Sequence, residues 1–308
     1  GGDLAPQMIQ ELKFNSRQKD LAVQEGKIVD EMNRSHIRQG LGIEKKLVEG
    51  KKHIILSGPQ GVGKTFGTLE ECRNAGMEPV FIPAGSSDIS IALTIAYTVY
   101  NLPPGKEAVI VFDDADDVIF GSYESLNKWK IATAKPNYDL GSIPTLEHNV
   151  SMGNTLKSLE SQGKTELIAA VESFSSEGTV GLSIPTDKLR FVILCNIDLE
   201  DMKQFRGKLK SAIPPTVDRF RYKRIEMSEN EAWGWLAYTL GNTQPFEDFP
   251  LTDIQKIEML NWIKPRWDKM RSTSFRAIED MAEDMINYPT DYEDKWQNQL
   301  KGPISLGR

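Results

Sequence analysis

Short apolar runs, separated by loops and helical segments, occupy the middle of this chain. Five runs predict strands, at residues 53–58, 79–84, 108–114, 190–196 and 224–227. Continuous apolar runs are typical of strands buried on both faces, and their alternation with helices predicts a parallel sheet. Because such sheets bind ligands at the carboxyl ends of their strands, we expect functional residues at the ends of these runs.

After residue 227 the strand pattern stops and helical signals replace it. Two pairs of residues have capping-box spacing: Ser228 with Glu231, and Thr252 with Gln255. Ser274 is predicted to cap a further helix with one apolar face, formed by Phe275, Ile278, Ala282 and Met285. Five of the six tryptophans lie between positions 233 and 296, which favours a compact helical domain with an aromatic core.

These patterns predict an α/β fold in three parts. Residues 1–52 are predicted to form an N-terminal helical segment, and residues 53–227 a three-layer αβα core with a parallel sheet. Residues 228–308 are predicted to form a small all-helical lid domain. Within the core, residues 121–164 are polar and rich in Ser, Asn, Gly and Lys. Connections of this length are typically insertions or functional loops, so we expect an insertion or a pore loop there.

Composition and charge narrow the function classes. With 39% hydrophobic and 26% charged residues in 308, the chain has the composition of a soluble globular protein. No apolar stretch of about 18 residues occurs, so we expect no membrane span. No secretion pattern opens the chain and only two cysteines are present, so we expect a cytoplasmic protein. The net charge of −7 argues against coating nucleic acid, although residues 203–224 form a local basic patch.

Directly after the first predicted strand, residues 57–65 read SGPQGVGKT. The phosphate-binding pattern G-x-x-x-x-G-K-[ST] covers Gly58, Pro59, Gln60, Gly61, Val62, Gly63, Lys64 and Thr65. Glycines let the backbone turn tightly so that N–H groups bind phosphate oxygens, and the next helix adds its positive end. Lys64 would supply charge to the outer phosphates, and the Thr65 hydroxyl would ligate Mg²⁺. A chance match is roughly one in a hundred, which favours a P-loop over a surface turn.

Two other predicted strands end in polar residues that could bind Mg²⁺ or position a water molecule. The run from 108 ends in Asp113 and Asp114, 49 residues after Lys64. Asp113 would hold Mg²⁺, which prefers a few oxygen ligands and keeps part of its hydration. Asp114 would polarise the water that attacks the γ-phosphate. Asn196, which closes the run from 190, would position that water.

Together these features resemble the AAA+ ATPase family over about residues 40–290. GPQGVGKT resembles its Walker A motif, VIVFDD its Walker B motif and Asn196 its sensor 1. The segment VDRF and the residues after it resemble the arginine-finger region, with Arg219 and Arg221 as candidates. SFRAIEDM resembles the sensor 2 helix, with Arg276 as its arginine. We find neither the N-K-x-D motif of GTPases nor an L-S-G-G signature of ABC ATPases, and a small-molecule kinase would have no use for the distal arginines.

Two features depart from the family pattern. Asp114 stands where the family usually has glutamate, and water-positioning geometry is sensitive at the ångström level, so hydrolysis could be slow or depend on a partner. In addition, 83 positions separate Asp113 from Asn196. The end of that segment, residues 166–196, is similar to MoxR-like members with an inserted hairpin.

The resemblance implies an ATP-hydrolysing, Mg²⁺-dependent motor that forms a homo-oligomer, with a ring as the expected form, in which Arg219 or Arg221 completes a neighbour's site. Its client would be DNA or a protein. On DNA, four residues of the polar segment would form a cationic and aromatic track: Lys128, Trp129, Lys130 and Lys135. On a protein client, Tyr123 or Trp129 would grip a polypeptide in the same pore. The alternative function is a nucleotide-gated adaptor or loader that assembles on DNA or a protein partner and hydrolyses ATP slowly.

Overall fold

The structure is a computed structural model that describes residues 16–42, 53–175 and 181–302. These residues form two compact units. The sheet unit comprises Ser35–Gly58 and Gly67–Ile225. The helical unit comprises the described residues up to Arg34, the loop segment Pro59–Phe66 and the described residues from Glu226 onward.

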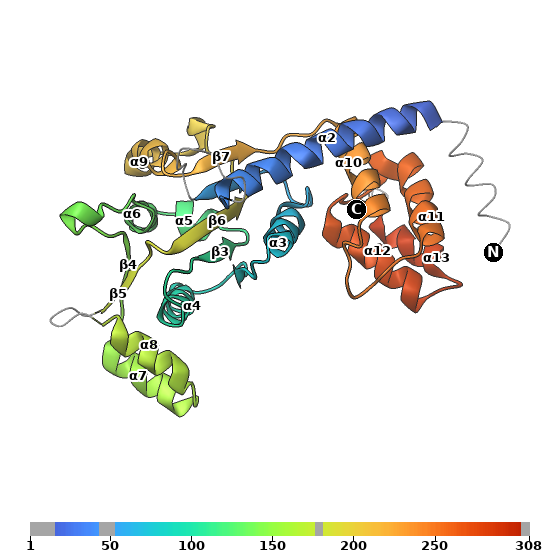
Figure 1. Ribbon diagram of the computed structural model, residues 1–308. Helices are drawn as coiled ribbons and strands as arrows, with labels where there is room; N and C mark the ends of the chain where they lie inside the picture. Colours follow the sequence, from blue (N-terminus) through green and yellow to red (C-terminus); the bar gives the residue numbers. More distant parts are fainter. Residues whose placement is uncertain (1–15, 43–52, 176–180, 303–308) are drawn as a thin grey trace, which may run out of the picture. The chain divides into compact units, whose positions relative to one another are not determined.

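The sheet unit is an α/β fold built on a five-stranded parallel sheet (Figure 1). In spatial order its strands are β2 (Val80–Ile82), β3 (Ala108–Phe112), β6 (Leu189–Cys195), β1 (Ile54–Ser57) and β7 (Arg221–Arg224). All four pairings are parallel, so the carboxyl ends of the strands share one edge. The predicted parallel sheet is therefore confirmed.

Helices of the sheet unit connect these strands. They are α4 (Asp88–Tyr100), α5 (Asp116–Phe120), α6 (Tyr123–Ala132), α7 (Met152–Ser161), α8 (Thr165–Ser173) and α9 (Gly207–Val217). Two further helices, α2 (Ser16–Gly40) and α3 (Lys64–Asn74), have residues in both units. Within the described residues, no helix combines the length and apolar character needed to cross a membrane.

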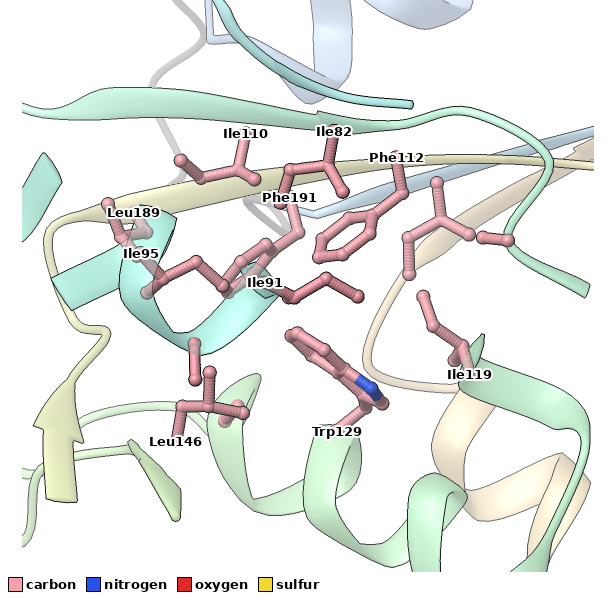
Figure 2. Packing of buried hydrophobic residues seen from close by; sticks show 14 of the residues in the cluster. Ile82, Ile91, Ile95, Ile110, Phe112, Ile119, Trp129, Leu146, Leu189 and Phe191 are labelled. Carbon is pink, nitrogen blue, oxygen red and sulfur yellow. The ribbon is translucent and has the colours of Figure 1, made fainter. Parts of the chain in front are cut away.

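Both faces of the sheet are buried, as continuous apolar runs predict. Figure 2 shows the face that α4 and α6 cover, where Trp129 of α6 packs against the sheet. The Trp129 ring meets Phe112 and Phe191 edge-on, with centroids 5.0 and 5.6 Å away. On the other face, a Cβ added to Gly40 of α2 would lie 1.8 Å from Ile54 Cγ2, so that approach of helix to strand requires glycine.

The last strand begins earlier than the sequence predicted. β7 covers Arg221–Arg224 instead of residues 224–227, and all four of its side chains are half-buried. It is a strand because its backbone pairs with β1, with Arg221 opposite Ile54. As an edge strand with one neighbour, it tolerates charged side chains. No apolar run marks it in the sequence, which explains the error.

The polar segment 121–164 is largely regular structure, which corrects the expectation of a pore loop. It contains α6, a short 3₁₀ turn (Tyr138–Leu140), β4 (Thr145–Asn149) and α7, the first helix of the helical hairpin that follows. β4 pairs antiparallel with β5 (Gly181–Pro185) in a separate two-stranded sheet. The few apolar residues of α6, at helical spacing, reach the core: Leu126, Trp129 and Ala132. Because the composition of residues 121–164 is polar overall, the amphipathic pattern of α6 was not recognised in the sequence.

The helical unit confirms the predicted helix starts. Its helices are α10 (Glu229–Asn242), α11 (Asp253–Ile263), α12 (Phe275–Asn287) and α13 (Tyr292–Trp296), with 3₁₀ turns at Lys264–Lys269 and Gln297–Gln299. Both predicted capping boxes are formed, and the Ser274 hydroxyl accepts a hydrogen bond from Ala277 N. The core is aromatic as predicted, with Trp235, Trp262 and Trp296 buried. These caps and rings fix the unit locally.

Candidate functional site

The carboxyl edge of the sheet gathers three of the predicted segments. β1 and β6 run in register, and Gly58 N donates to Cys195 O at 3.0 Å just beyond them. Asp113 follows β3, and its N–H donates to Ile82 O at 3.0 Å. The glycine loop, the acidic pair and Asn196 therefore all leave their strands at this edge, as the sequence predicted from parallel pairing.

Asp114 and Asn196 meet directly. Asn196 Nδ2 donates to Asp114 Oδ1 at 3.2 Å, although 82 positions separate them in the chain. Asp114 has φ 49°, the only positive φ of a residue other than glycine among those described. Aspartate tolerates this left-handed conformation better than most residues, because its short polar side chain can form local hydrogen bonds. The arrangement directs a carboxylate and an amide toward one point.

Burial and neighbouring carboxylates both act on the pKa of Asp114. Loss of hydration raises the pKa of Asp114 above its usual range, and its hydrogen bond with Asp116 and the negative charges of Asp116, Asp113 and Asp117 raise it further. A carboxylate with a raised pKa accepts a proton more readily, which is the property required of a general base.

Asp113 is half-buried beside this pair. No cluster of three or more His, Cys, Asp or Glu side chains suited to a metal occurs in the described part of the chain. That finding is compatible with Mg²⁺, which needs only one or two protein oxygens when phosphate and water supply the others. Within the sheet unit, the Asp113 carboxylate has the right donor chemistry for such an ion.

The glycine loop belongs to the helical unit, and its shape excludes side chains at two positions. Gly61 and Gly63 have φ of +80° and +74°, in the left-handed region. A Cβ on Gly61 would lie 2.1 Å from Ser274 Cα, and one on Gly63 would lie 2.4 Å from Trp235 Cζ2. The loop therefore combines a backbone conformation that favours glycine with close packing that leaves no room for a side chain.

The cationic residue of the loop lies over the loop itself. Lys64 Nζ donates to Pro59 O at 3.0 Å. Within the helical unit the loop is anchored by Phe66, whose ring meets Phe275 edge-on at 5.6 Å and carries the Arg34 guanidinium 5.5 Å from its centroid. Thr65 is half-buried in the first turn of α3, and the remaining predicted loop residues lie between Gly58 and Gly63.

The predicted arginines occupy different environments. Arg276 is exposed in the first turn of α12, as expected. Arg221 is half-buried and its Nη2 donates to Gln39 Oε1 at 2.6 Å within the sheet unit. Arg219 is half-buried before β7, and its Nε is buried without a hydrogen-bond partner among the described residues.

Trp129 cannot serve as the predicted gripping residue, because it is 2% exposed in the core. Lys128 is also drawn inward: its Nζ lies 3.1 Å from His148 Nδ1, and burial lowers the pKa of Lys128. Tyr123 is 42% exposed, with Lys208 Nζ 5.8 Å from its ring centroid. Of the two aromatic candidates, only Tyr123 can reach a client.

Sequence reasoning missed three residues that hold the carboxyl edge together: Ser57, Asp116 and Arg224. Their hydrogen bonds all converge on the backbone of Asn196 and Ile197. The only sequence signal was the position of Asp116 in the acidic run that follows β3. No protein-family model matches this chain, and a search of curated proteins finds no match. The function must therefore be argued from the residues themselves.

Proposed function

We propose that this protein binds and hydrolyses ATP with Mg²⁺ as an AAA+-type motor. The observation that carries this proposal is the Asn196–Asp114 hydrogen bond at the sheet edge from which the glycine loop departs. A phosphate-binding loop, a metal-binding carboxylate and a water-positioning pair are the parts that phosphoryl transfer to water requires.

Each predicted residue has a role in this proposal. The loop from Gly58 to Thr65 would bind the phosphates through backbone N–H groups, with Lys64 neutralising the outer phosphates. Asp113 and Thr65 would hold Mg²⁺, which lowers the negative charge of the phosphates when bound. Asp114 would accept a proton from the attacking water while Asn196 orients that water. The helical unit would act as a lid, and Arg276 would contribute a cation to the same nucleotide.

The chain would act as a homo-oligomer in which an arginine completes the site of a neighbouring copy. A cation at the developing phosphoryl charge is worth 10³–10⁵ in rate in related nucleotide hydrolases. Arg219 is the better candidate, because Arg221 already donates to Gln39 of its own chain.

The client would be DNA or a protein. Exposed cations gather at and before the start of α9 and would favour an anionic client: Lys203, Arg206, Lys208 and Lys210. Tyr123 lies beside Lys208 and could stack on a base or grip a peptide. A nucleotide-gated adaptor or loader is the second candidate, favoured by the short Asp114 side chain in the place where the resembled family usually has glutamate, which would slow hydrolysis.

The decisive experiment measures Mg-ATP binding by calorimetry on the full chain and on Lys64→Ala. We expect the variant to bind about 10–100-fold more weakly, since a charged hydrogen bond is worth 1.5–3 kcal/mol. Lys106→Ala, an exposed lysine in a turn, is the matched control and should bind as the wild type does. Equal affinity of Lys64→Ala and wild type, or no binding by either, contradicts the proposal.

Turnover separates the two candidate functions. A motor should hydrolyse ATP faster when single-stranded DNA, duplex DNA or an unfolded protein is added. A rate that stays below about one per minute under all conditions favours the adaptor.

A further inference from the structure

The peptide segment Asn196–Ile197, just beyond β6, is held from its N–H side by a single carboxylate. Asn196 N donates to Asp116 Oδ1 and Oδ2 at 3.0 and 3.1 Å, and Ile197 N donates to Oδ2 at 2.8 Å. Asp116 is the first residue of α5, three positions after Asp113. Oδ2 accepts from both N–H groups and Oδ1 from that of Asn196 alone, so an amide side chain would keep only one of these acceptor oxygens and would lose the charge.

The same segment is held from its carbonyl side by residues of two other strands. Arg224 Nη1, at the end of β7, donates to Asn196 O at 2.6 Å and to Ser57 Oγ at 2.8 Å. Ser57, the last residue of β1, donates in turn from Oγ to Ile197 O at 2.5 Å. We call these three residues, Ser57, Asp116 and Arg224, the clamp.

The clamp fixes one partner of the pair that faces the attacking water. The Asn196 side chain reaches Asp114 Oδ1, so a shift of the Asn196 backbone would change that contact. Asp114 is fixed separately, because the next residue, Ala115, donates from its N–H to Leu194 O at 3.0 Å. With Asp114 anchored to β6 and Asn196 clamped, the distance between amide and carboxylate is set by these contacts.

Arg224 is not placed for stability alone. Its Nε is buried without a hydrogen-bond partner among the described residues, which is unfavourable for folding. A neutral side chain would avoid that cost, but it would lose the charged donor that Nη1 supplies to both Asn196 O and Ser57 Oγ. The guanidinium is therefore better explained by the geometry that it imposes on Asn196.

We infer that Asp116 and Arg224 are positioning residues for ATP hydrolysis, which hold the Asn196 amide against Asp114 and so fix the attacking water. This inference rests on the proposed function. It adds two residues that touch neither nucleotide nor water, and it connects the edge strand β7 to the hydrolytic pair. Because both act after substrate is bound, they affect kcat and leave ATP affinity unchanged.

The test compares kcat, KM and Mg-ATP affinity of the full-length wild type with those of Asp116→Asn, Arg224→Gln and Arg224→Lys. We expect Asp116→Asn and Arg224→Gln to lower kcat about 10-fold or more, since small misplacements of reacting groups are costly, with KM and Kd within about twofold. Arg224→Lys keeps a charged donor on a shorter side chain and should recover part of the loss. Asp139→Asn, an exposed carboxylate in the Tyr138–Leu140 turn and outside the site, is the matched control and should keep wild-type kcat.

The variants of Asp116 and of Arg224 serve as controls for one another, because the two residues hold Asn196 from opposite sides. Asp116 also contacts the Asp114 carboxyl group, so its variant changes local charge as well as geometry. Arg224 acts on Asn196 from the carbonyl side, and it carries the test alone if Asp116→Asn is unfolded at the assay temperature. The inference is overturned if Arg224→Gln keeps the wild-type kcat, or if both variants lose kcat and ATP affinity equally. Either outcome leaves the proposed ATPase function standing. A wild type that binds ATP without hydrolysing it overturns the inference and favours the adaptor, and one that does not bind ATP removes the proposed function as well.

Discussion

The carboxyl edge of the sheet unit and the glycine loop of the helical unit are held in place by different interactions. At the sheet edge, hydrogen bonds fix polar groups, and Asp116 alone accepts three of them from backbone N–H groups. In the loop, close packing fixes the backbone, because any Cβ on Gly61 would overlap Ser274 and any Cβ on Gly63 would overlap Trp235. The first region should therefore be sensitive to loss of donors and acceptors, and the second to added volume.

The largest expected effect concerns the two cores that support these regions. Trp129 is 2% exposed in the sheet unit and Trp296 is 0% exposed in the helical unit. We expect Trp129→Ala and Trp296→Ala each to lower the free energy of unfolding by about 3–5 kcal/mol. Hydrogen exchange should show the loss of protection first in β3 and β6 for Trp129→Ala and in α12 for Trp296→Ala. Identical exchange patterns for the two variants would show that the division into units has no energetic meaning.

A smaller effect tests whether shape holds the glycine loop. We expect Gly63→Ala to cost about 2–4 kcal/mol, because the left-handed φ and the overlap with Trp235 both oppose a Cβ. Gly76→Ala is the matched control, since Gly76 has the same φ of +74° but open space around its Cβ. It should cost only about 1–2 kcal/mol. Urea unfolding measures both, and equal losses would mean that packing against Trp235 contributes nothing.

The smallest effect is specific to the sheet unit, which contains all three histidines of the chain: His36, His53 and His148. Burial, with the charges of Lys223 and Arg221, lowers the pKa of His36 from 6.5 to about 4. The folded state therefore favours neutral His36. Neutral His36 therefore contributes roughly 1–2 kcal/mol to the free energy of unfolding, after allowing for partial exposure. This contribution is fully present above pH 6.5 and is lost as the pH falls toward 4.

Replacing that histidine provides the check. His36→Gln cannot be protonated, so its free energy of unfolding should fall less between pH 6.5 and 4 than that of the wild type. Titration of His148, whose pKa is also lowered by burial and by Lys128, remains in both proteins and cancels in the difference. An unchanged pH dependence in His36→Gln would contradict the assignment.

The sequence by itself determined the parallel sheet, the helix starts and the segments that carry the candidate chemistry. Apolar runs marked β1, β3 and β6 because strands buried on both faces need apolar residues throughout, and the capping boxes of α10 and α11 are local hydrogen bonds between residues three apart. The glycines at 61 and 63 could be predicted for the same reason, since a tight turn requires them locally. The sequence also placed Asp114 and Asn196 at one edge, because parallel strands end together.

Only the tertiary structure decided which polar residues hold that edge. Arg224 lies on a strand with no apolar run, which exists because β1 pairs with it, and its target Asn196 is 28 positions away. Trp129 lies in a polar segment, yet it is buried because α6 packs on the sheet. Local patterns record the preferences of neighbouring residues. Contacts between distant segments depend on how the strands are ordered, and a single sequence pattern does not contain that order.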